Sequence, residues 1–256
     1  MRKESRAFEI GTEEWLAQTG GRLTIPQALA LSAQGLTQSA RDRLDRSRPD
    51  RDESSHQAAR VDVARKELVD VLDTLRDRVV ERQGHGMLNH ACRTYVLGAA
   101  LLSDEHFRRV NLTASAVAAL AHDDGLVHPS TPGDCFSADS AVEVNAMIDQ
   151  MGASHRSASS GTVARAAVIA HFQPILPTQA SADAQLVALG ASADVMGFGL
   201  RRLDVGLTQE VWQAWPDLRF LADVKELLKG ERTRAPRTRP GVLARSGMPY
   251  LLRSSR

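Results

Sequence analysis

The sequence has few aromatic residues, only two cysteines and no long uninterrupted apolar run. Aromatic residues make up 4% of the 256 residues, and the alternating Val, Ile, Thr and Tyr runs that a sheet needs are missing. Cys92 and Cys135 lie far apart, so a disulfide framework is not expected and a reducing cytoplasm is the expected location. Apolar stretches stop well short of the roughly 18 residues that a membrane span requires. The start, MRKESRAFEIGTEEW, lacks the apolar core of a signal peptide.

A strong net charge is also missing, which argues against nucleic acid or a membrane surface as the partner. The 32 basic and 31 acidic residues leave a formal charge of +1, so the whole molecule carries no strong field. Residues 226–256 are locally rich in Lys and Arg. This tail can meet an anionic partner, but the favoured interpretation is a solvated, partly disordered end.

What the sequence does contain is abundant Ala and Leu in helical patterns. Both residues favour helix, and a hydrophobic content of 43% is enough for one sizeable core. In VDVARKELVDVLDTLRDRVVERQ, apolar residues recur at three-residue and four-residue steps. The sequence therefore predicts an all-α fold, with further helices over 88–102, 112–122, 137–151, 161–172, 181–197 and 208–229.

Three regions are expected along the chain. Residues 1–57 form an N-terminal arm and charged linker, because 41–56 (RDRLDRSRPDRDESSH) has almost no apolar surface to bury. The arm, with Trp15 and IPQALALSAQGL as its hydrophobic features, can pack on the core or on a second subunit. Residues 58–229 form the helical domain, and residues 230–256 form the basic tail.

The candidate chemistry begins with a His-Asp pair at the end of an apolar helix. His122 and Asp123 follow AVAALA, and charges at the end of a buried stretch must be paired or must bind a metal. The alternative is a helix end open to water, with Asp123 and Asp124 solvated. Three further apolar helices each carry one lone polar residue able to bind a metal: His90 in LNHACRTYVLGAALL, Asp194 in LVALGASADVMGFG and His171 in VARAAVIAHF.

A lone His on an apolar face is usually a hydrogen-bonded core residue, whereas a lone Asp is rarer because its charge needs a cation or several donors. The order His, His-Asp, distant Asp resembles the HD superfamily of metal-dependent hydrolases. The segments quoted above, with AALAHDDGL and VWQAWPDLRF, resemble the cyanamide hydratase-like branch over roughly residues 85–228. This resemblance implies an HD-domain helical bundle with a metal site between core helices. It also implies an enzyme that adds metal-activated water to a cyanamide-like, nitrile-like or phosphoester substrate.

The resemblance implies four ligands for one divalent ion: His90, His122, Asp123 and Asp194. Zinc is the favoured metal, and iron and manganese also suit these ligands. His171 is implied as a substrate contact or proton shuttle, and Asp124 as a second proton carrier. Arg93, one turn after His90, is expected to pair with Asp123, to bind an anionic substrate, or to form a surface salt bridge.

Some features depart from the family or leave alternatives open. Cys92 stands where the branch often has a small hydroxyl residue, and substrate selection is expected in the loop after Leu126. There is no Gly-rich phosphate loop and no Lys beside the His-Asp pair, which disfavours nucleotide hydrolysis. One alternative is a di-iron oxygenase that uses His155 and His171. Another is a non-catalytic, metal-stabilised binding module. His85 and His128 are expected in loops, and a homo-oligomer is suggested by fold analogy alone.

Overall fold

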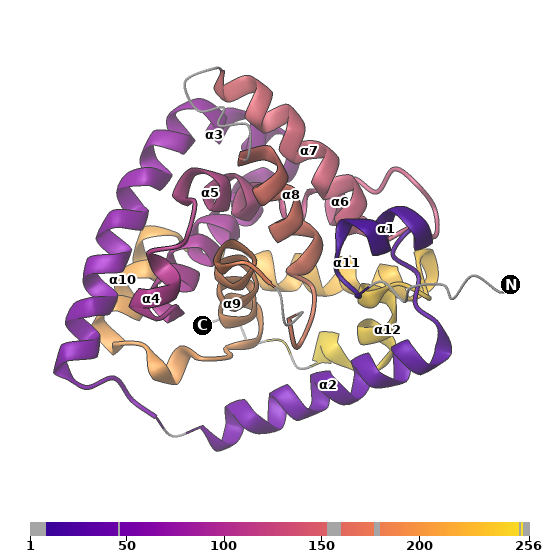
Figure 1. The fold of residues 1–256 in the computed structure, drawn as a ribbon, viewed down its shortest axis with the longest axis horizontal. Coiled ribbons are helices and arrows are strands. Elements are labelled where there is room, and N and C mark those ends of the chain that lie inside the picture. The colour runs from indigo at the N-terminus through magenta and orange to yellow at the C-terminus, as the bar shows by residue number, and fades with distance from the viewer. Residues whose placement is uncertain (1–8, 46, 153–159, 177–179, 251, 253–256) are drawn as a thin grey trace, which may run out of the picture.

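The structure is a computed structural model that describes residues 9–45, 47–152, 160–176, 180–250 and 252. It confirms the all-α prediction, since the described residues contain helices and a single β-bridge between Arg22 and Thr238 but no strand. None of the described helices is both long and apolar enough to span a lipid bilayer. The elements (Figure 1) are α1 Glu13–Thr19, α2 Ile25–Leu44, α3 Arg51–Leu101, α4 Asp104–Phe107, α5 Leu112–Ala121, α6 Asp124–Val127, α7 Phe136–Met151, α8 Ser160–Ala170, α9 Ala182–Met196, α10 Val205–Ala214, α11 Phe220–Arg234 and α12 Arg239–Arg245, with short 3-10 turns at Leu200–Arg202 and Met248–Tyr250.

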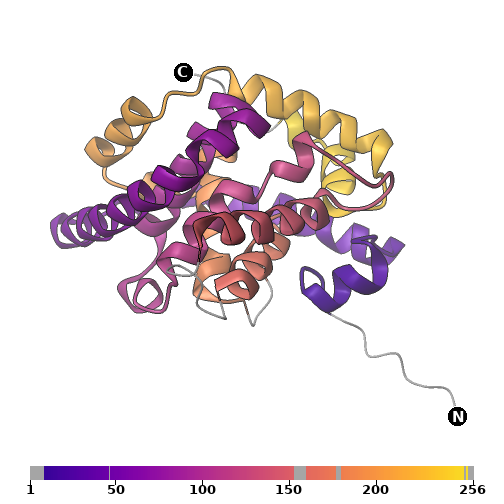
Figure 2. The same cartoon turned by 90° about the horizontal axis from the view of Figure 1, so that it is seen from above.

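Helix α3 is the longest element and consists of two arms. Gly84, with φ 81° and ψ 168°, interrupts the helical backbone, a conformation that glycine adopts without steric cost. The first arm runs along one edge of the molecule (Figures 1 and 2), and most of its charged residues are exposed. In the second arm almost every residue from Met87 to Leu101 is buried. His90 therefore lies on a helix in the middle of the core.

Helix α9 packs against the second arm of α3 at unusually close range. A Cβ added to Gly190 would lie 1.7 Å from the carbonyl oxygen of Thr94, and one added to Gly98 would lie 2.1 Å from that of Leu186. Only glycine at both positions lets the two backbones approach this closely. The contact places the end of α9, with Asp194, beside His90.

Helix α5 carries the His-Asp pair into the same region. Asn111 caps its start by accepting a hydrogen bond from the amide of Ala114, and the helix is buried from Ala114 to Ala121. His122 is the C-cap residue of α5, and Asp123 is the N-cap residue of the short helix α6. The pair therefore sits where one buried helix stops and the chain turns.

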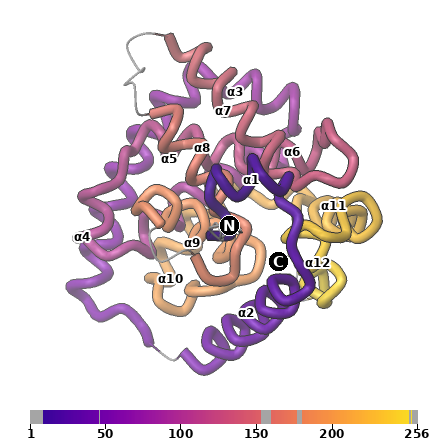
Figure 3. Tube along the Cα trace, turned by 45° about the vertical axis from the view of Figure 1, so that its right-hand side comes forward, coloured from indigo at the N-terminus to yellow at the C-terminus, as the bar shows by residue number. Residues whose placement is uncertain are grey.

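The N-terminal arm packs on the rest of its own chain. Thr24 and Gln27 form a capping box at the start of α2, which then runs along the molecule beside α12 (Figure 3). The hydroxyls of Ser32 and Ser246 are 2.7 Å apart, and the carboxylate of Asp42 accepts a hydrogen bond from the amide of Gly199. The described part of the arm, from residue 9, therefore packs on its own chain.

Two predicted boundaries differ from the structure. The charged stretch 41–56, expected to be a linker, belongs to helix except for residues 45–50, of which 46 lies outside the described residues. In the tail after Lys229, expected to be partly disordered, residues 230–234 continue α11 and residues 239–245 form α12, which is buried from Arg239 to Ala244, while residues 251 and 253–256 lie outside the described residues. Both segments are charged, yet tertiary contacts hold them in place.

Candidate metal centre

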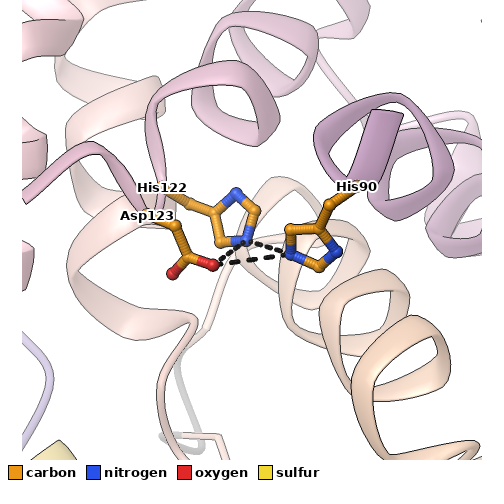
Figure 4. A group of neighbouring side chains, drawn as sticks. All are labelled: His90, His122 and Asp123. Carbon is orange, nitrogen blue, oxygen red and sulfur yellow. Dashed lines mark hydrogen bonds and ion pairs between the residues drawn. The ribbon is translucent and has the colours of Figure 1, made fainter. Parts of the chain in front are cut away.

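Three buried side chains from two segments meet at one point (Figure 4). The Nε2 atoms of His90 and His122 are 3.0 Å apart, and Oδ2 of Asp123 lies 3.5 and 3.4 Å from them, respectively. His90, His122 and Asp123 are 1%, 2% and 6% exposed, respectively, so water does not solvate the group freely. This buried His-His-Asp group can hold a metal ion.

The opposite ring nitrogens fix which atoms face the centre of this group. Nδ1 of His122 donates to the carbonyl oxygen of Ala119 at 2.7 Å, and Nδ1 of His90 donates to Oδ2 of Asp194 at 2.7 Å. In the neutral rings, each Nε2 then presents a lone pair to the other and to Asp123. Three acceptors at this separation need a cation, or a proton, between them.

The pKa shifts of the three side chains agree with this requirement for a cation or a proton. Burial opposes charge on His90, but hydrogen bonds with Asp123 and Asp194 outweigh it and raise its pKa. Burial lowers the pKa of His122 to about 3, with His171 and His90 acting in the same direction. The pKa of Asp123 lies well below its usual value, because His122, His171 and His90 outweigh the effect of burial. Asp123 is therefore an anion. It faces the neutral imidazole of His122 and the imidazole of His90, with which it can share a proton.

His171 adds a fourth nitrogen to the site. It follows the last residue of α8, is buried, and donates from Nδ1 to the carbonyl oxygen of Val168. Its Nε2 has no hydrogen-bond partner and lies 3.7 Å from Oδ1 of Asp123. A buried ring nitrogen without a hydrogen-bond partner costs free energy. Its presence fits a site where this nitrogen contacts a ligand or an ion.

Asp194 lies behind His90 instead of joining His122 and Asp123. Its two oxygens accept hydrogen bonds from Nε and Nη2 of Arg93 at 2.8 and 2.7 Å, and Oδ2 also accepts from His90. Burial would raise the pKa of Asp194, but the bonds from His90 and Arg93 lower it to about 2. This geometry favours a positioning role for Asp194 over the ligand role expected from the sequence.

Arg93 is fully buried, which excludes the surface salt bridge considered above. Besides Asp194, it donates to the carbonyl oxygens of Trp215 and Pro216. It does not line the cavity beside the triad, and its partner is Asp194, not Asp123. The predicted substrate contact therefore has no geometric support at Arg93.

Asp124 also faces away from the triad. Its carboxylate accepts two hydrogen bonds from Arg82, at 2.9 and 2.7 Å, and Arg78 and Glu143 extend the same ionic cluster. A carboxylate held in this way is poorly placed to carry protons at the candidate centre. Sequence reasoning missed Arg82, because one more Arg on the charged face of a long helix carries no local signal.

The other histidines among the described residues do not join the group. His85 and His128 are exposed, and Nε2 of His128 donates to the carbonyl oxygen of Arg82. His155, a candidate ligand for a second iron, lies outside the described residues.

A cavity of about 110 Å³ opens beside the triad. His90, His122, Asp123 and His171 line it, together with mostly apolar residues. Helices α2 and α12, from the arm and the tail, contribute to the lining, whereas residues 127–136, which follow Leu126, contribute none of it. Part of the cavity lining thus comes from the N-terminal arm and the C-terminal tail, for which no role in the site was predicted.

No family model, curated protein or solved structure matches the chain. The fold and the site together define an all-α protein with a buried His-His-Asp group able to hold a metal ion.

Proposed function

We propose that this chain is a metal-dependent hydrolase or hydratase of the HD type, which adds water to a small electrophile. The observation that carries the proposal is the convergence of His90 Nε2, His122 Nε2 and Asp123 Oδ2 in a buried site without a donor among them. Two imidazoles and one carboxylate beside an open cavity are the donor set of many catalytic zinc sites. Zinc is therefore the favoured ion, with iron and manganese as alternatives.

In this proposal, the residues of the site have different roles. When bound, a divalent ion would lower the pKa of a coordinated water towards about 7. Asp194 and Arg93 hold the ring of His90 so that its Nε2 stays directed at His122 and Asp123. His171, with an unpartnered Nε2 at the cavity, accepts the proton of the attacking water and returns it to the product.

Metal analysis of the full chain, purified without chelator, tests the metal part of the proposal. We expect one ion per chain in the native protein and a loss of that ion in His90→Gln. The matched control is His85→Gln, because His85 lies on the same helix but is exposed. Protein that contains no metal, and takes up none when zinc, manganese or iron is added, would contradict the proposal.

A turnover assay tests the chemistry. Metal-loaded protein is incubated with cyanamide, simple nitriles and phosphomonoesters, and urea, amide or phosphate is measured as the product. We expect activity on one of these classes that disappears with a chelator and falls sharply in His171→Gln. Two irons per chain, together with oxygen consumption, would instead identify the di-iron oxygenase. A metal-loaded protein without any turnover would favour the binding module.

A further inference from the structure

The cavity beside the triad contains no cationic side chain among the described residues that line it. Its only carboxylate is Asp123, and its only basic groups are the three imidazoles of the site. Arg239, which is buried and donates to the carbonyl oxygen of Ile169, does not line the cavity. Arg82 is paired with Asp124, and Arg93 is paired with Asp194. Neither arginine of these two pairs can turn to a phosphate or carboxylate without leaving a buried carboxylate unpaired.

The outer walls of the cavity are apolar. Leu36 of α2, Val195 of α9, Leu228 of α11 and Leu243 of α12 line it, and three of these four side chains are buried. The few polar groups are partly committed to one another, since the hydroxyls of Ser32 and Ser246 lie 2.7 Å apart. Such walls gain free energy from an apolar ligand and offer little to a charged one.

We propose that the cavity takes a neutral, largely apolar small molecule, with its single polar reacting group at the triad and its tail against α2, α9 and α12. The position of the reacting group rests on the proposed function, whereas the class of the tail rests on the cavity walls alone. A volume of about 110 Å³ is smaller than the roughly 150 Å³ engineered cavity that accepts benzene, so the tail is short. Alkyl nitriles fit this description, and alkyl phosphates do not.

Binding to the full chain tests the proposal without any need for turnover. Dissociation constants for acetonitrile, propanenitrile and butanenitrile are measured by NMR titration of the protein as purified. Propyl phosphate, which shares the propyl chain of butanenitrile, is titrated in parallel. We expect affinity for the nitriles to rise about three- to fourfold with each methylene group that becomes buried. Butanenitrile should bind more tightly than propyl phosphate.

Two variants test the cause of the discrimination. Leu36→Arg places a guanidinium at the cavity mouth, and Leu29→Arg adds the same charge to the same helix at a residue that does not line the cavity. Both leucines are largely exposed, at 64% and 68%, so neither change threatens the fold. We expect Leu36→Arg to strengthen propyl phosphate binding about fivefold, the effect of one opposite charge at close range in water. Leu29→Arg should leave it unchanged.

The outcomes separate this inference from the proposed function. Affinity that does not depend on chain length, or propyl phosphate that binds more tightly than butanenitrile, would overturn the inference. An equal response of the two arginine variants would also overturn it. A steep dependence on chain length in protein that holds no metal would support the inference while contradicting the proposed function.

Discussion

Oδ2 of Asp194 accepts a hydrogen bond from Nδ1 of His90 at 2.7 Å, on the side of the imidazole that faces away from His122 and Asp123. The same oxygen accepts a second bond from Arg93, so the carboxylate, the ring and the guanidinium hold one another in a fixed orientation. Partners of this kind set the tautomer and direction of a metal-binding histidine. We therefore propose a positioning role for Asp194, and this role can be tested.

Asp194→Asn should weaken metal binding without abolishing it. The amide keeps an oxygen acceptor for His90 but loses the charge, and loss of such a partner typically costs about 10- to 100-fold in metal affinity. Competition with a chromophoric chelator gives the dissociation constant, with Asp123→Asn as the reference for loss of a direct ligand. If Asp194→Asn loses metal as completely as Asp123→Asn, the ligand role expected from the sequence is correct.

Arg93 and Asp194 should be strongly coupled in stability. Both side chains are fully buried, so removing either partner leaves an uncompensated charge and costs about 3–5 kcal/mol. We expect Arg93→Met with Asp194→Asn to cost clearly less than the sum of the two single changes. Urea denaturation of the four proteins in the cycle measures the coupling. Additive costs would show that the pair acts as two independent groups.

The fold class was predictable from the sequence, because Ala-rich and Leu-rich patterns report local preference. The expected helices over 112–122 and 181–197 correspond closely to α5 and α9. The start of α3 was not predictable, because its charged residues are held by distant partners. Arg60, for example, is buried by Asp104 and by carbonyl oxygens at the end of α3's second arm.

The candidate site was predictable as a set of residues but not as an arrangement. Lone His and Asp residues on apolar helices indicated the right part of the core. The sequence does not show that Arg93 occupies both oxygens of Asp194, because one turn of helix also brings Arg93 near other groups. Nor does it show that Arg239, in a basic tail, is buried over the ring of Trp15.

Asp124 should contribute to stability through Arg82. Its buried carboxylate accepts two charged hydrogen bonds, so Asp124→Asn should lower the free energy of unfolding by about 1–3 kcal/mol. Glu81→Gln, at an exposed residue next to Arg82, is the control and should change stability by less than about 0.5 kcal/mol. Chemical denaturation measures both. An Asp124→Asn protein of native stability but without activity would restore the proton-carrier role expected from the sequence.

Cys92 should make the protein less stable at high pH. Burial raises the pKa of its thiol from 9.0 to about 12. Between these two values the unfolded chain has lost the thiol proton and the native protein retains it, so stability falls as pH rises, by about 1.4 kcal/mol per pH unit. Denaturation from pH 8 to about 11 in the native protein and in Cys92→Ala isolates this contribution. Parallel pH profiles for the two proteins would contradict it.

The close approach of α3 and α9 should be necessary for the candidate centre. In Gly190→Ala the new methyl group would lie 1.7 Å from the carbonyl oxygen of Thr94, so the two helices must move apart. We expect a loss of about 3 kcal/mol in the free energy of unfolding, at the upper end for overpacking. Weaker metal binding should accompany it, because Asp194 leaves His90.

Gly230→Ala is the matched control for this change. Gly230 lies inside α11, and a Cβ added there meets nothing within 4 Å. Alanine should therefore stabilise the helix by up to about 1 kcal/mol and leave metal binding unchanged. Denaturation and metal titration of both variants compare a methyl group at the α3–α9 contact with one in open space. If Gly190→Ala binds metal as tightly as Gly230→Ala, the centre does not depend on this contact.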